Sequence, residues 1–210
     1  MVITFHGLES IKITKGDHTI AFNPPSKKSK HSNASFGADI TLVSVNHPDF
    51  NGVDTTSRGD KESFVVKGPG EYEVKEFFIR GFATKTNYDN KERINTVYSL
   101  EIDGINVAYL GALDDKELSS DIKEELGQAD ILFVPIGGDG VLNASDAFKT
   151  AVKREPAIII PIHYGDIADK NALKDFLKEG GQEDIKPVEK LTIKKKDLEG
   201  KKGEIVVLKN

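Results

Sequence analysis

The 210-residue chain contains no cysteine and no tryptophan, and it has only one methionine. Without cysteine there can be no disulfide, no thiolate metal ligand and no cysteine nucleophile, so any metal site has to use His, Asp, Glu or water. The absence of cysteine also suits a reducing compartment. The N-terminus turns polar too early for a signal peptide, and no apolar run is long enough to span a bilayer. We therefore expect a cytoplasmic protein with no membrane partner.

The chain also lacks an excess of positive charge. Its formal net charge is −5, which gives no broad attraction to nucleic acid or to anionic lipid. We therefore expect no nucleic-acid partner. A chain of this length with 38% hydrophobic residues is large enough for one sizeable core, which predicts a single domain over residues 1–210.

The hydrophobic pattern changes along the chain. Short β-branched and aromatic runs in the first half predict strands, with an Asp103-Gly104 hairpin between the last two. The second half alternates helical and extended patterns, with Asn143 as a helix N-cap. The predicted strands are residues 2–5, 10–14, 18–22, 39–45, 63–66, 72–83, 94–102, 105–110, 131–135, 157–162, 191–194 and 204–208; the predicted helices are 115–126, 144–153 and 170–178. This order alone indicates an α/β or α+β protein.

The most informative segment is residues 44–52, which directly follows the apolar run 40–43. It carries His47 and Asp49 two positions apart. A buried strand that ends in such a loop is a common way to build a metal site, because the strand fixes the backbone while imidazole and carboxylate converge on one cation.

Four further segments, taken in order, resemble the metallo-β-lactamase superfamily. They are the GPGEYEV run at 68–74, the YLGA run at 109–112, the strand and glycine turn at 130–138, and the PIHY run at 161–164. With the loop at 44–52 they resemble the hydrolase-like branch of that superfamily that carries the GPGEYEV motif. The resemblance implies an α+β fold, an αββα sandwich in which two mixed β-sheets pack face to face with helices outside.

The resemblance assigns metal-ligand positions one by one. In the loop they fall on Val45, His47, Asp49 and Phe50. The bridging position falls on Ala112, and the late histidine is His163. His47, Asp49 and His163 keep ligand chemistry, whereas Val45, Phe50 and Ala112 have no lone pair to offer a cation. Because a catalytic zinc needs about three protein ligands, the superfamily's two-metal reaction centre is expected to be lost.

Two functions follow from this depleted motif. The first is a binding or structural protein that uses the residual pocket for an unidentified small molecule and needs no cofactor. The second is a hydrolase of an ester, amide or phosphoester that holds a single Zn, Mn or Fe ion on His47, Asp49 and His163. In that enzyme Asp49 or Glu71 would orient the attacking water, although a surface role for Glu71 is at least as well supported.

Three other expectations concern residues near the pocket and the assembly of the chain. Asp114 and Asp115 could replace the missing bridge, although carboxylates there also suit the start of a helix. The loops at 26–36 and 87–93 carry no recognisable signature, and we expect them to set the specificity of the pocket. Assembly of the chain as a homo-oligomer, or with an active homologue, is a further hypothesis.

Overall fold

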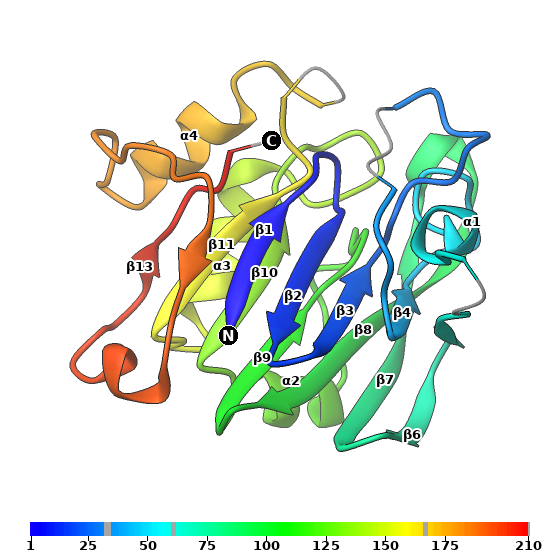
Figure 1. Cartoon of the computed structure of the whole chain (residues 1–210). Helices are drawn as coiled ribbons and strands as arrows, with labels where there is room; N and C mark the ends of the chain where they lie inside the picture. Colours follow the sequence, from blue (N-terminus) through cyan, green and yellow to red (C-terminus); the bar gives the residue numbers. More distant parts are fainter. Residues whose placement is uncertain (32–34, 60–61, 166–167, 210) are drawn as a thin grey trace.

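The computed structural model describes residues 1–31, 35–59, 62–165 and 168–209, and its two β-sheets lie face to face (Figure 1). The first sheet begins as an antiparallel meander and continues with parallel strands. Its spatial order is β12 (Leu191–Thr192), β1 (Val2–Phe5), β2 (Ile11–Lys15), β3 (His18–Phe22), β4 (Ile40–Val43) and β5 (Phe64–Lys67).

The second sheet is also mixed. Strands β6 to β9 are antiparallel, whereas β9, β10, β11 and β13 run parallel. Its spatial order is β13 (Glu204–Ile205), β11 (Ile158–Ile162), β10 (Ile131–Pro135), β9 (Ile105–Tyr109), β8 (Arg93–Ile102), β7 (Phe77–Thr86) and β6 (Gly70–Val74). The two mixed sheets confirm the predicted α+β sandwich.

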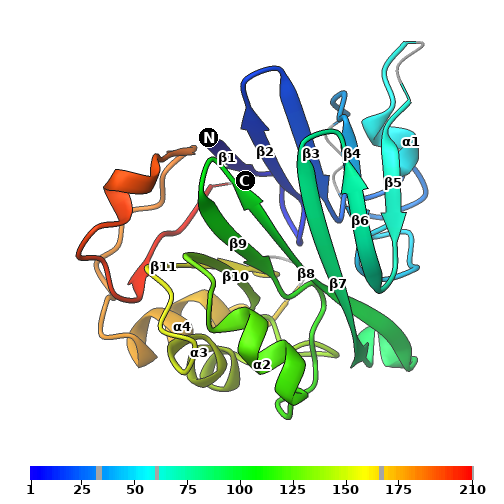
Figure 2. The ribbon, with the colours of Figure 1, turned by 90° about the horizontal axis from the view of Figure 1, so that it is seen from below.

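Helices lie outside the sheets. Figure 2 shows α2 (Ser120–Leu126), α3 (Ala144–Val152) and α4 (Ala172–Glu179) against the outer side of the second sheet, and the short α1 (Val53–Thr56) beside β4 and β5. Two 3₁₀ turns, η1 (Tyr88–Asn90) and η2 (Lys195–Leu198), complete the described elements. The predicted cap of α3 is confirmed, because the Asn143 side chain accepts the backbone N–H of Asp146 at 3.0 Å.

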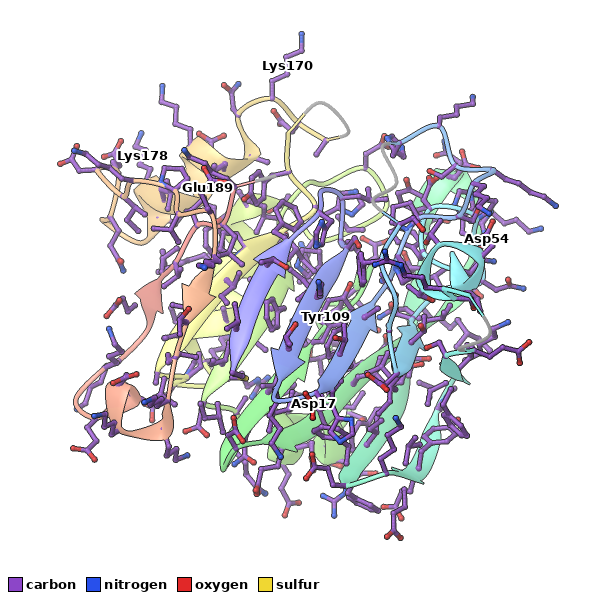
Figure 3. All side chains as sticks on the ribbon, viewed as in Figure 1. Asp17, Asp54, Tyr109, Lys170, Lys178 and Glu189 are labelled. Carbon is purple, nitrogen blue, oxygen red and sulfur yellow. The ribbon has the colours of Figure 1, made fainter. Side chains whose placement is uncertain are left out.

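The hydrophobic core has two main layers. One fills the space between the sheets and contains Phe22, Tyr109 and Phe133; Figure 3 shows Tyr109 between the two layers of strands. The other lies between the second sheet and its helices and contains Phe176. Strands β10 and β11 are buried along their whole length, because the core covers one of their faces and helices cover the other.

Two sequence predictions about elements were wrong. The strand expected over 72–83 is two strands, because the chain turns between β6 and β7, where Lys75 adopts a left-handed backbone with φ 56°. The helix expected from residue 115 begins only at Ser120, after Ser119 caps it by accepting the backbone N–H of Ile122. Asp115 instead accepts the backbone N–H of Glu117 at 2.8 Å, so it does not start the helix.

The topology brings several loops together at one edge of the sandwich. The loops that follow β4, β9, β10 and β11 leave the carboxyl ends of strands in the two sheets. They meet the turn between β1 and β2 and the loop between β7 and β8 in one cluster of contacts. No helix among the described residues is long and apolar enough to cross a membrane.

Candidate functional site

An apolar cluster occupies the place where the loops meet. Val45, Phe50 and Ala112 come from the loops after β4 and β9, and they are 1%, 0% and 0% exposed. They pack with Leu8 and Val141 into one small hydrophobic cluster, against which the half-buried Tyr88 ring also packs. The three positions at which the resemblance expects metal ligands are therefore neighbours in space, and hydrocarbon fills the volume among them.

His163 lies at the end of β11 with a left-handed backbone, φ 58°. It is 1% exposed, and its Nδ1 is 2.7 Å from Oε1 of the fully buried Glu9. The other carboxylate oxygen of Glu9 accepts the Asn23 amide at 2.8 Å, and the Tyr109 hydroxyl donates to the Glu9 carbonyl at 2.7 Å. Burial raises the pKa of Tyr109 well above its usual value. A buried polar network thus holds His163 by the ring nitrogen that faces Glu9.

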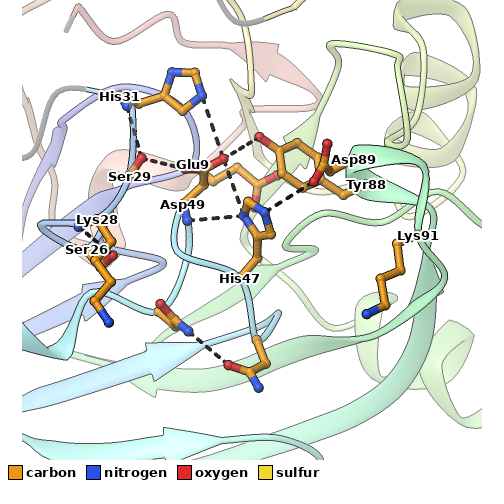
Figure 4. Close-up of polar contacts among 12 residues, drawn as sticks. Glu9, Ser26, Lys28, Ser29, His31, His47, Asp49, Tyr88, Asp89 and Lys91 are labelled. Carbon is orange, nitrogen blue, oxygen red and sulfur yellow. Dashed lines mark hydrogen bonds and ion pairs between the residues drawn. The ribbon is translucent and has the colours of Figure 1, made fainter.

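His47 and Asp49 form a second polar group nearer the surface (Figure 4). Both Asp49 oxygens accept hydroxyl donors, from Ser29 at 2.5 Å and from Tyr88 at 2.8 Å. Oδ2 of Asp49 also lies 3.4 Å from Nδ1 of His47 and 3.7 Å from Nε2 of His31. Burial and the hydrogen bond to Asp49 both raise the pKa of Tyr88, so this hydroxyl stays a donor to the carboxylate.

Two aromatic rings pack against both histidines. The Tyr88 ring centroid is 5.2 Å from that of His47 and 5.6 Å from that of His163, with nearly perpendicular planes in both pairs. Phe50 lies 6.1 Å from His47 and 6.4 Å from His163. Within the described part of the chain, no hydrogen bond or ion pair joins His163 to His47 or to Asp49.

The loop that carries Tyr88 is tightly seated. Asp89 and Asn90 both have left-handed backbones, with φ 56° and 52°. Thr86 donates to the Gly140 carbonyl at 2.9 Å, and the Arg93 guanidinium donates to the Tyr88 carbonyl. A Cβ at Gly140 would lie 2.6 Å from the Tyr88 Cα, closer than two such carbons can approach. Gly140 is therefore needed for this loop to dock.

Above His47 and Asp49 the surface opens into a cavity of about 370 Å³, which we call the His47 cleft. Its lining comes from the loop after β3, the loop after β4, the loop between β7 and β8, and the loop after β10. Two of these contain segments expected to set specificity, 26–36 and 87–93, of which residues 32–34 lie outside the described residues.

Several expected participants lie elsewhere. Glu71 stands on the edge strand β6 with its side chain 70% exposed and 3.7 Å from Arg80, so it does not point into the pocket. Its position in an exposed strand explains this, because alternate side chains of β6 face solvent. Asp114 and Asp115 remain outside the apolar cluster and outside the lining of the His47 cleft.

Sequence reasoning missed three contributors. Glu9 was not considered, because its partner lies 154 residues away in the chain. Tyr88 has no motif around it, and none marks His31, which faces Asp49. The one signal for Glu9 in the sequence is its place in the short segment Gly7-Leu8-Glu9-Ser10, directly before an apolar strand.

Two mixed sheets face to face, outer helices and a His-x-Asp loop at strand ends define a protein of the metallo-β-lactamase fold class. A family model described as "Beta-lactamase superfamily domain" matches residues 2–163. The chain belongs to this family, and its resemblance to the metallo-β-lactamase superfamily is confirmed.

Named relatives and solved structures agree with this placement. A UPF0173 metal-dependent hydrolase of Lysinibacillus sphaericus is 27% identical over 197 residues, covering 78% of this chain and 85% of the relative. One of Natranaerobius thermophilus is 24% identical over 188 residues, covering 78% and 83%. The crystal structure of a metallo-β-lactamase superfamily protein of Thermotoga maritima has a TM-score of 0.76 and 26% identity, covering 99% of this chain and 98% of that one.

Proposed function

We propose that this protein is a member of the metallo-β-lactamase superfamily that has lost two-metal hydrolysis and acts by binding a small molecule at the His47 cleft. The observation that carries the proposal is the apolar cluster of Val45, Phe50 and Ala112, where ligands would have to be. We further propose that the chain is one domain, works in the cytoplasm and needs no cofactor, nucleic acid or membrane; self-association is part of the same proposal.

The residues present do not fit a pair of metal ions. No group of three or more His, Cys, Asp or Glu side chains in the described ranges is arranged to hold a metal. Both Asp49 oxygens already accept hydroxyls, and the Nδ1 of His163 faces Glu9. A cation among Val45, Phe50 and Ala112 would lose its hydration without gaining ligands. The free energy of this desolvation is far larger than any stabilisation that apolar side chains give to an ion.

The second candidate is a hydrolase with one metal ion on His47, Asp49 and His163. The names of the relatives favour it, because they are metal-dependent hydrolases. The packing of the Tyr88 and Phe50 rings opposes it, since each ring lies against both His47 and His163. Glu71 has no place in either function, because its side chain is exposed on β6.

Elemental analysis of protein purified without chelators separates the two candidates. The binding protein should contain no stoichiometric Zn, Mn or Fe and should not hydrolyse generic esters or phosphodiesters. A bound metal that disappears in His163→Ala would refute the loss of the metal site.

Restoring the ligands gives the converse test. The triple variant Val45→His, Phe50→His and Ala112→Asp should bind zinc that survives dialysis. A matched control adds the same side-chain types at exposed positions, Phe64→His, Phe78→His and Ala83→Asp, and should bind none. Failure of the first variant to gain metal while remaining folded would contradict the assignment of Val45, Phe50 and Ala112.

A further inference from the structure

Opposite charges line the His47 cleft without neutralising one another. Lys28, Lys30 and His31 come from the loop after β3, whereas Asp89 and Asp139 come from two other loops. Among the described residues, no ion pair or hydrogen bond engages the ammonium groups of Lys28 and Lys30 or the carboxylate of Asp139. His31 lies 3.7 Å from Asp49, and Asp89 lies 3.7 Å from His47. The charges that stay unpaired over the open space are therefore those of Lys28, Lys30 and Asp139.

The charges are grouped by side. Figure 4 places His31 and Lys28 on one side of His47 and Asp49, and Asp89 on the other. Asp139 belongs to the side of Asp89, because the next residue, Gly140, packs on the backbone of Tyr88. Among the residues that line the cleft, cations and anions thus stand on opposite sides; Lys91, which Figure 4 shows on the side of Asp89, does not line it.

The floor between the two sides is fixed in advance. Asp49 is 7% exposed, and hydroxyls of Ser29 and Tyr88 satisfy its oxygens. The Asp49 backbone N–H lies 3.3 Å from Nδ1 of His47, and Nε2 of the same ring lies 3.7 Å from Asp89. Because these groups already have partners, a ligand would gain most from the unpaired charges of Lys28, Lys30 and Asp139.

The acidic side is also strained. Asp89 and Asp139 both adopt left-handed backbones, with φ 56° and 52°. Such conformations are uncommon for non-glycine residues, although Asp adopts them more readily than most, and they collect at functional sites. Here they hold the Asp89 and Asp139 backbones beside the cleft opening.

We propose that the His47 cleft binds a small zwitterion, an amino acid or a close analogue, with its ammonium toward Asp89 and Asp139 and its carboxylate toward Lys28, Lys30 and His31. This inference rests on the proposed function, because it requires a cleft that serves binding. The volume of about 370 Å³ is near the lower end of ligand pockets, which suits a molecule of this size. A purely anionic or cationic ligand would satisfy one side and face repulsion from the other.

The test is calorimetric titration with a ladder of ω-amino acids, from glycine to 6-aminohexanoate. The preferred length reports the separation of the two sides. The N-acetyl and methyl ester derivatives of the preferred amino acid each lack one charge. They should bind at least tenfold more weakly, because each loses a charged hydrogen bond. Equal binding of a derivative and its parent would overturn the proposal.

Variants locate the binding. Asp139→Asn keeps a residue that tolerates a left-handed backbone, and both it and Lys30→Gln should weaken the zwitterion about tenfold. Matched controls with the same charge changes are Asp184→Asn and Lys186→Gln, exposed residues outside the cleft lining, which should leave affinity unchanged. Unchanged affinity in Asp139→Asn and Lys30→Gln, or no binding by any member of the ladder, overturns the proposal.

Metal analysis of the same preparation keeps the two hypotheses apart. A metal-free protein that binds no zwitterion refutes only the ligand assignment. A stoichiometric metal ion refutes the proposed function itself.

Discussion

The buried contact between Glu9 and His163 offers a sharp test of how this site is held together. A carboxylate only accepts hydrogen bonds, and here it receives the Asn23 amide at 2.8 Å and faces His163 Nδ1 at 2.7 Å. Glu9→Gln keeps the shape but must turn an N–H toward either the Asn23 amide or His163 Nδ1. Either the Asn23 amide loses its acceptor, or His163 has to give up its Nδ1 proton and change tautomer, in a site that is buried.

The loss of the carboxylate's charged hydrogen bonds, together with an unsatisfied buried donor or a forced change of imidazole tautomer, should cost about 3 kcal/mol of unfolding free energy. With a urea m-value of about 2 kcal/mol per molar, the midpoint falls by about 1.5 M. Urea unfolding followed by circular dichroism measures this shift. The matched control is Glu73→Gln, the same chemical change at an exposed position, and it should move the midpoint little.

A double-mutant cycle then isolates the pair. If Glu9 acts mainly through His163, then Glu9→Gln and His163→Gln together should cost at least 1 kcal/mol less than the sum of the single changes. Additivity within about 0.5 kcal/mol would refute the reasoning, because it would mean that the 2.7 Å contact contributes no coupling of its own.

Much of the fold could be predicted from the sequence because its signals are local. Alternation and β-branched residues identified β1 and β3 with correct ends, and Asp103-Gly104 identified a hairpin whose two residues both have positive φ. The turn between β6 and β7 was missed because Lys75 takes a left-handed backbone without a glycine, proline or asparagine to announce it. The predicted start of helix α2 was too early, because carboxylates at 114 and 115 are typical of the first turn of a helix.

The site was harder to predict, since its contacts join distant parts of the chain. The resemblance led to Val45, Phe50 and Ala112, and their side chains could be read as apolar before their positions were known. Nothing local pairs Glu9 with His163, which is 154 residues away, and no pattern marks Tyr88 as the ring beside His163. Such contacts depend on topology, which a single sequence specifies only indirectly.

Three further predictions concern packing and pH. Phe50→Ala should lower the free energy of unfolding in urea by about 3–5 kcal/mol, because the side chain is fully buried. Phe64→Ala, at a half-exposed position, should lower it far less. Similar losses of stability in the two variants would contradict a structural role for Phe50. Gly140→Ala should destabilise the protein and weaken the packing of Tyr88, because the new Cβ would clash with the Tyr88 Cα. The tyrosine near-UV circular dichroism measures the change in packing. An unchanged unfolding midpoint would refute that clash. Burial raises the pKa of Tyr98 from its usual 10 to about 12. The unfolded chain therefore releases this proton first, so the stabilisation is complete below pH 10 and is lost as the pH rises toward 12. At about 1.4 kcal/mol per unit, Tyr98 contributes about 3 kcal/mol to that loss. In Tyr98→Phe the unfolding free energy should fall less steeply between pH 10 and 12, although other buried tyrosines retain part of the slope; a slope equal to that of the parent protein would show that Tyr98 does not stay protonated in the fold.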